Sequence, residues 1–236
     1  MREGGATLAS ALPPARARGM VAPMNAPSHP FAGSTLFASL RSPFARRVRV
    51  AFLEAGLPFV ERTEDVLRPS AELLAANPLG RVPTLRLPDG AVLVESQLIL
   101  ERFWAACSPG SAPLVPQALA ARLRSDAASG LAVGVCERTV ALFFEGLRPP
   151  ALRDAGALEE IRGELAAALG RLESMLAPGP FLLGAAPCAG DVDVAIALDY
   201  VSLRVDRGWH ERHPRLLALA ERLATRESLR RTAPPP

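Results

Sequence analysis

The sequence contains no lysine, because all 27 of its basic residues are arginine. It has one tyrosine, no CxxC pair and three scattered cysteines, which are Cys107, Cys136 and Cys188. Such sparse cysteines argue against a disulfide framework and suit a reducing compartment, so we predict a cytoplasmic location. The sequence also lacks any run of about 18 consecutive apolar residues, which predicts no transmembrane helix and no membrane partner.

A strong excess of charge is also missing, although the formal net charge of +3 first suggests a basic protein. Residues 1–33 contain three arginines and one acid, so the remaining residues are nearly neutral. Nucleic-acid binding needs a basic patch, and we therefore predict no nucleic-acid partner. The 236 residues are 49% hydrophobic and 22% charged, which is typical of one large globular domain or two small ones.

The patterns along the chain predict two folded parts of different class. We expect a disordered leader over 1–33, which is rich in Ala, Gly and Pro and shows no periodicity. From 34 to 108, strands and helices alternate in the order β-α-β-α-β-β-α, which predicts a small α/β domain. A Pro-, Ser- and Gly-rich linker follows over 109–117. Residues 118–236 show only helical periodicity and predict an all-α domain.

The expected elements have definite bounds. In the α/β domain they are strands at 35–38, 59–63, 82–87 and 91–94, and helices at 44–55, 71–76 and 96–106. In the all-α domain they are helices at about 118–147, 155–177, 191–207 and 214–225. The first helix is expected to be amphipathic, with Arg46, Arg47 and Arg49 outside its apolar stripe. Ser96 is expected to cap the third helix.

Three short motifs in the α/β part match one known family in order and spacing. They are Ser39-x-x-Ser42-Pro43-Phe44-x-x-Arg47-Val48-Arg49, Asn77-Pro78-Leu79-Gly80-Arg81-Val82-Pro83 and the pair Glu95-Ser96. With the helical domain behind them, they resemble the serine-type members of the cytosolic glutathione S-transferase family over about 34–236. The end of the chain resembles a bacterial YibF-like subgroup. The resemblance implies a homodimer and a thioredoxin-like N-terminal domain followed by an all-α C-terminal domain.

The first motif places a hydroxyl where a thiolate can be stabilised. A free thiol has a pKa of about 8.5, and a hydroxyl donor at a helix N-terminus stabilises the anion by its hydrogen bond and by the helix dipole. In the resemblance, Ser42 matches the thiol-activating serine, and Ser39 at the end of the strand is the second choice. Either serine can instead be only a helix cap, since serine is favoured at that position.

The other two motifs supply the rest of the glutathione site that the resemblance implies. The bond Val82–Pro83 matches the family's cis-proline, where the backbone of Val82 pairs with the tripeptide as a strand would. Ser96 presents its hydroxyl and N–H to a carboxylate, Glu95 pairs with the γ-glutamyl ammonium, and Arg81 assists at the glycine carboxylate. The plain alternatives are an edge-strand proline, a capped helix and a solvated arginine.

Two further motifs are not expected to do chemistry. Cys188-Ala189-Gly190-Asp191 resembles the family's S/T-x-x-D capping box, with Asp191 at N3 and Cys188 in place of the hydroxyl residue. A thiol is a poorer acceptor, so we expect a weaker structural cap. The run Trp209-His210-Glu211-Arg212-His213 is one residue short of HExxH, and we predict no metal site.

These interpretations predict an enzyme that joins the glutathione thiolate to a small hydrophobic electrophile, with glutathione as co-substrate. The electrophile is expected between the domains, where Leu142, Phe143 and Phe144 can contribute. Tyr200 lies too far along the chain to be the thiol-activating tyrosine of other classes. The alternatives are a glutathione-dependent isomerase, lyase or peroxidase, which would use the same thiolate, and a non-catalytic transferase-like binding module.

Overall fold

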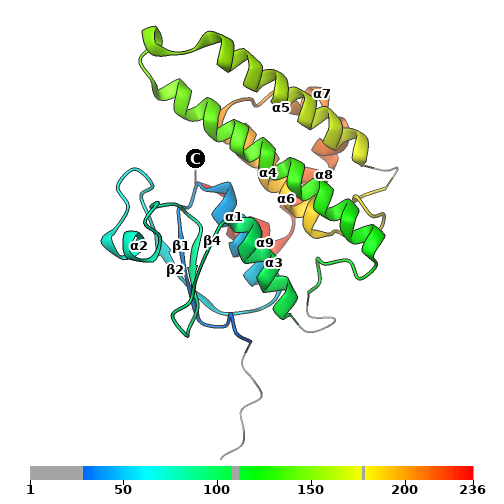
Figure 1. The fold of residues 1–236 in the computed structure, drawn as a ribbon. Coiled ribbons are helices and arrows are strands. Elements are labelled where there is room, and N and C mark those ends of the chain that lie inside the picture. The colour runs from blue at the N-terminus through cyan, green and yellow to red at the C-terminus, as the bar shows by residue number, and fades with distance from the viewer. Residues whose placement is uncertain (1–28, 108–111, 177–178, 236) are drawn as a thin grey trace, which may run out of the picture.

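The N-terminal domain is a four-stranded sheet with helices on both faces. The computed structural model describes residues 29–107, 112–176 and 179–235. In chain order the domain consists of β1 (Ser34–Ala38), α1 (Pro43–Glu54), β2 (Phe59–Thr63), α2 (Ala71–Ala76), β3 (Thr84–Arg86), β4 (Val92–Val94) and α3 (Ser96–Ala106). The strand order is β2-β1-β3-β4; β1 is parallel to β2, and the other two pairs are antiparallel. Helices α1 and α3 lie on the face toward the helical domain, and α2 lies on the other (Figure 1). The predicted order of elements is confirmed.

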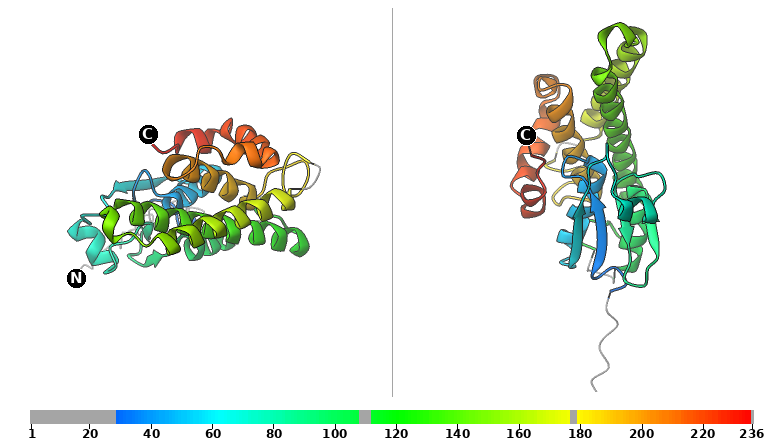
Figure 2. Two further views of the ribbon diagram at one scale, coloured as in Figure 1. Left: turned by 90° about the horizontal axis from the view of Figure 1, so that it is seen from above. Right: turned by 90° about the vertical axis from the view of Figure 1, so that its left-hand side faces the viewer.

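The C-terminal domain is all helical, as predicted, and is built around α6. Its elements are α4 (Leu119–Leu147), the 3₁₀ turn η1 (Pro150–Leu152), α5 (Ala155–Met175), α6 (Ala189–Arg204), α7 (Trp209–Arg212), α8 (Pro214–Ala224) and α9 (Glu227–Arg231). The turn from α4 to α5 projects away from the sheet domain (Figure 2). The sequence did not predict η1, α7 and α9, because such short segments show no periodicity.

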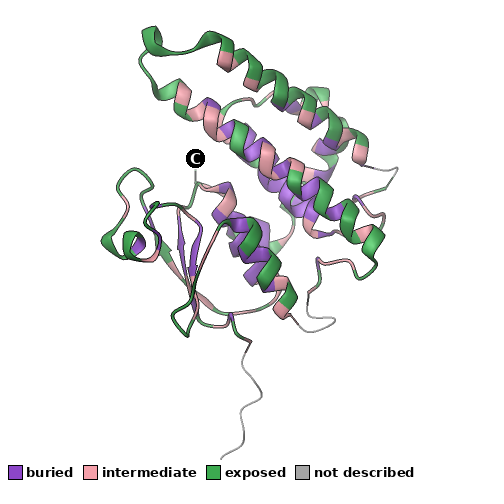
Figure 3. Cartoon of the chain, in the orientation of Figure 1, coloured by how far each residue is buried: buried purple, intermediate pink, exposed green. Residues whose placement is uncertain are grey.

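Each domain has its own hydrophobic core, and α1 and α6 carry much of the buried surface (Figure 3). Phe52 and Phe103 lie at the centre of the sheet-domain core, with ring centroids 4.7 Å apart. Helix α4 is long and apolar enough to cross a membrane by length and composition alone. It packs along α5 and α6, however, and eight of its residues are buried, so in this fold it is a core helix.

The boundary of the leader differs from the prediction, and part of the predicted linker packs against the helical domain. Residues 1–28 lie outside the described part, but 29–33 are placed, and Phe31 is 4% exposed. Its ring packs edge-on against Phe103 at 5.4 Å, so the expected disorder is wrong for these five residues. Residues 108–111 of the linker region also lie outside the described part. Beyond them, Leu114 is buried in the helical core and its carbonyl accepts the Ala189 N–H at 2.8 Å.

Helix α1 is amphipathic, as predicted, with its arginines outside the apolar stripe, but both of its faces are buried. Arg46, Arg47 and Arg49 are only 3%, 3% and 5% exposed. The sheet covers one face, while α6 and α9 of the other domain cover the second. The arginines therefore form part of the seam between the domains, where Asp193 and Asp199 of α6 pair with two of them.

Candidate functional site

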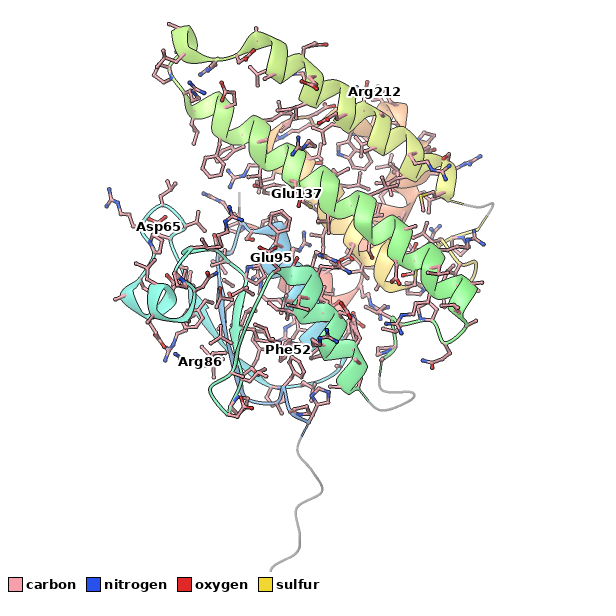
Figure 4. The ribbon with its side chains drawn as sticks, in the orientation of Figure 1. Phe52, Asp65, Arg86, Glu95, Glu137 and Arg212 are labelled. Atoms are coloured by element: carbon pink, nitrogen blue, oxygen red, sulfur yellow. The ribbon has the colours of Figure 1, made fainter. Side chains whose placement is uncertain are left out.

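A cavity of about 570 Å³ lies between the two domains. In the N-terminal domain it is lined by Ser39, Arg41, Ser42, Pro43, Phe44, Val66, Asn77, Leu79, Gly80, Arg81, Val82, Pro83, Val94, Glu95 and Ser96; in the helical domain it is lined by Glu137, Val140, Phe143, Phe144, Tyr200 and Arg204. Figure 4 labels Glu95 and Glu137, which approach this space from opposite sides. All six residues predicted to form the glutathione site line this one cavity.

Ser42 is the N-cap of α1 and also faces the cavity. Its Oγ accepts a hydrogen bond from the Ala45 N–H at 3.2 Å, and Pro43 occupies the first helical position. An accepting hydroxyl keeps its own proton for donation. The capping role therefore does not compete with donation to an anion. Ser39 lines the same cavity, and its carbonyl accepts the Ser42 N–H at 3.0 Å.

The segment 77–83 is held by a buried asparagine. The Asn77 amide donates to the Arg81 carbonyl at 3.2 Å and to Thr84 Oγ1 at 3.0 Å, and its Oδ1 accepts the Leu79 N–H at 3.1 Å. Gly80 has φ of +61°, and a Cβ there would lie 2.9 Å from a side-chain carbon of Pro69. The Val82–Pro83 peptide bond is cis, as the sequence motif predicted. Arg81 is exposed.

The start of α3 is built differently from the prediction. Glu95 is the N-cap residue, without a side-chain cap bond, and Ser96 is the first helical residue. The expectation that Ser96 caps the helix is therefore wrong. Its Oγ accepts from Arg47 Nη1 at 2.9 Å, and Arg47 Nε also donates to Asp193 Oδ1 at 2.7 Å. Burial lowers the pKa of Arg47, but Asp193 outweighs burial and the net shift is upward.

This connection was missed at the sequence level because it joins three elements. Arg47 on α1 holds α6 through Asp193 and holds the N-terminus of α3 through Ser96 and Gln97. The helical domain thus fixes the position of Ser96, which the sequence predicts to bind glutathione. One sequence signal could have indicated this connection. Three closely spaced arginines lie in a helix whose other residues are mostly apolar and typical of a core helix.

The helical-domain wall of the cavity combines aromatic and charged side chains. Phe143 and Phe144 line it as predicted, whereas Leu142 is 6% exposed and belongs to the helical core. The sequence analysis excluded Tyr200 from thiol activation but did not place it or Arg204 in the cavity. The two residues are one helical turn apart on α6, a spacing that puts them on the same face. Burial raises the pKa of Tyr200, and the neighbouring Arg204 opposes this shift.

The predicted capping box at α6 is present and lies outside the cavity lining. Asp191, which is fully buried, accepts the Cys188 N–H at 2.9 Å and the Leu182 N–H at 2.8 Å. The Cys188 thiol donates to the same carboxylate at 3.1 Å, and burial raises its pKa to about 11. Ser125 of α4 accepts the Gly190 N–H at 3.0 Å and adds an acceptor that the motif alone does not reveal.

Comparison with known proteins decides which family has this arrangement. Residues 41–104 match the model of the glutathione S-transferase N-terminal domain, and residues 155–222 match that of the C-terminal domain. The chain is 32% identical over 210 residues to a probable glutathione S-transferase GSTU1 of Oryza sativa subsp. indica, covering 83% of this chain and 87% of that protein. The chain belongs to the glutathione S-transferase family.

Within the glutathione S-transferase family, the similarity extends to bacterial members. YibF of Escherichia coli K12, an uncharacterized GST-like protein, is 29% identical over 201 residues, which are 85% of this chain and 98% of YibF. A crystal structure of a glutathione S-transferase from Methylobacterium radiotolerans JCM 2831, in complex with glutathione sulfonate, has a TM-score of 0.80 and 32% identity. It covers 86% of this chain and 95% of that one. These findings confirm the predicted architecture and the likeness to the YibF-like subgroup.

Proposed function

We propose that this protein is a glutathione transferase that joins the glutathione thiolate to a small hydrophobic electrophile in the cavity between its domains. The observation that carries the proposal is the convergence of three separated motifs on one cavity: the Ser42 turn, the Val82–Pro83 segment and the Glu95-Ser96 pair. Aromatic side chains of the helical domain lie on the opposite wall. We further propose that the protein acts in the cytoplasm as a homodimer.

Each side of the tripeptide has a partner of suitable chemistry. The exposed carboxylate of Glu95 pairs with the γ-glutamyl ammonium, and the backbone N–H of Ser96 at the start of α3 receives the adjoining carboxylate. The backbone of Val82 pairs with the cysteinyl residue as a strand would. Arg81 is exposed at the cavity and assists at the glycine carboxylate.

Ser42 activates the thiol in this proposal. Lowering the thiol pKa by two units requires about 2.7 kcal/mol of differential stabilisation of the thiolate. One charge-assisted hydrogen bond contributes about 1.5–3 kcal/mol, and the N-terminus of a twelve-residue helix adds a favourable dipole. The same thiolate would serve isomerase, lyase or peroxidase chemistry, and assays of the wild-type protein with a panel of electrophiles separate these reactions from conjugation.

The decisive experiment compares Ser42→Ala with Ser70→Ala. Ser70 is a matched control, because its Oγ caps α2 through the Leu73 N–H at 3.1 Å and does not line the cavity. We expect Ser42→Ala to raise the pKa of bound glutathione and to lower kcat/KM by about tenfold to a hundredfold. Ser70→Ala should keep the ultraviolet absorbance of the thiolate that forms on binding.

The outcomes separate the alternatives. If Ser42→Ala keeps the thiolate signal and Ser39→Ala loses it, Ser39 is the activating residue. If the wild-type protein is retained on immobilised glutathione but forms no thiolate and no product with any electrophile, the protein is a non-catalytic binding module. A wild-type protein that does not bind glutathione at all contradicts the proposal.

A further inference from the structure

Arg204 brings an unusual charge into the aromatic wall of the cavity. It is the last residue of α6 and lines the cavity, with its guanidinium carbon 4.1 Å from the centre of the Phe143 ring and 5.8 Å from that of Tyr200. Its Nε is buried and has no hydrogen-bond acceptor among the described residues. None of the ion pairs within the described ranges includes Arg204.

This cation has hydrogen-bonding capacity left for a ligand: it bonds Tyr200 within the fold, but its Nε has no acceptor among the described residues. A buried N–H donor without an acceptor is unfavourable, and a guanidinium binds a carboxylate through two parallel hydrogen bonds. The cation–π contact with the Phe143 ring holds the guanidinium in place without using its N–H groups as hydrogen-bond donors to a carboxylate. Glu137 on the same wall is exposed to water, so its carboxylate is solvated without a ligand.

We propose that the electrophile carries a carboxylate that Arg204 binds, with its apolar body against Phe143 and Phe144. This inference rests on the proposed transferase function and names its substrate class as aryl or unsaturated carboxylic acids with one electrophilic carbon. For an aryl halide, the sulfur–carbon bond forms at the carbon that bears the halogen. The carbon–halogen bond then breaks, halide leaves with the electron pair, and the thiol proton has already passed to water.

A matched pair of electrophiles tests this proposal. The probes are 4-chloro-3-nitrobenzoate and 4-chloro-3-nitrobenzamide, which react at the same ring carbon and differ in the charged group. The ratio of kcat/KM for the two probes is divided by the ratio of their uncatalysed rates with glutathione. We expect the wild-type protein to favour the benzoate by roughly tenfold or more, as for a hydrogen-bonded charge pair.

Variants then assign that preference to one side chain. Arg204→Gln should remove most of the preference, whereas Arg204→Lys should keep part of it because the positive charge remains. Arg207→Gln is the matched control, since Arg207 is exposed and does not line the cavity. It removes the same charge three residues away and should leave the preference intact.

The alternative source of the carboxylate is glutathione itself, and KM for glutathione distinguishes it. The proposal is supported if Arg204→Gln loses the benzoate preference while KM for glutathione stays within twofold. It is overturned if the wild-type protein shows no benzoate preference, or if Arg204→Gln keeps that preference and raises KM for glutathione. The wild-type comparison needs no variant to fold. Turnover of the amide as fast as the benzoate would leave the transferase function in place, whereas failure to bind glutathione would remove both.

Discussion

Charge is used in two different ways at the domain seam and in the cavity. At the seam, Arg46 meets Asp199 and Arg47 meets Asp193, each at 2.7 Å, so buried cations have carboxylate partners within the chain. In the cavity, Arg81 and Glu95 are exposed, and the guanidinium of Arg204 lies over the Phe143 ring. The difference indicates that charge at the seam positions the domains, while charge in the cavity remains available to a ligand.

The largest expected effect is the loss of the Arg47 side chain. Arg47→Ala leaves Asp193 buried without its cation, and such a break costs about 3–5 kcal/mol of the free energy of unfolding. Urea denaturation measures this change. Arg138→Ala is the control, because its pair with Glu164 is exposed and should contribute less than about 1 kcal/mol.

A double variant sharpens the interpretation of that loss. The lost free energy of unfolding can come from the unpaired, buried carboxylate of Asp193. In that case Arg47→Met combined with Asp193→Leu should recover most of the stability. The double variant should still weaken glutathione binding, because Ser96 and Gln97 lose their hydrogen-bond donor. Equal effects of Arg47→Ala and Arg138→Ala on unfolding would contradict the assigned role of the seam.

An intermediate effect is expected from acid at a third ion pair of the seam, which joins Glu54 of α1 to Arg226. Burial raises the pKa of Glu54, but hydrogen bonds from Arg226 and Ser228 outweigh burial, so the net pKa lies below its usual value. The stabilisation is therefore present above the unfolded-state pKa and is lost as pH falls through the lower folded-state pKa.

We expect Glu54→Gln to cost about 1 kcal/mol at neutral pH and progressively less in acid. Chemical denaturation at a series of pH values measures this dependence. Glu227→Gln is a suitable control, because Glu227 and Arg231 form an exposed pair. A constant difference between wild type and Glu54→Gln down to strongly acidic pH would show that this carboxylate is not stabilised by its partners.

The smallest effect on stability is expected in the cavity. Arg81→Gln should change the free energy of unfolding by less than about 0.5 kcal/mol, since Arg81 is exposed. The same substitution should weaken the binding of glutathione by a few-fold, as expected for the loss of an exposed charge pair. Isothermal titration calorimetry can measure this change in affinity. A variant that unfolds more easily while binding glutathione normally would reverse the comparison between cavity and seam.

Much of the fold follows from local signals in the sequence. Serine and proline at 42 and 43 begin α1, and Gly56 with φ of +64° follows its end, because caps and left-handed glycines act within a few residues. The three motifs that line the cavity were also found from sequence, since each is a short contiguous run. The structure places them together along one cavity.

What the sequence did not reveal depends on contacts between distant elements. Periodicity placed the arginines of α1 outside its apolar stripe, but it carries no information about α6 covering that face. Ser96 reads as a cap by residue type, although its hydroxyl bonds Arg47 from another helix. Tyr200 and Arg204 reach the cavity only because α6 passes beside α4. Tertiary packing decided each of these cases.

Glu95 shows how selection for stability and selection for activity would diverge in this protein. Among the described residues other than glycine, it alone has a positive φ, of 70°. A side chain in that conformation costs roughly 1–3 kcal/mol, and glycine would adopt it without strain. Laboratory evolution under heat alone would therefore drift toward glycine at this position. In the proposed function Glu95 binds glutathione, so evolution under a requirement for turnover would retain the carboxylate and tolerate the strained backbone.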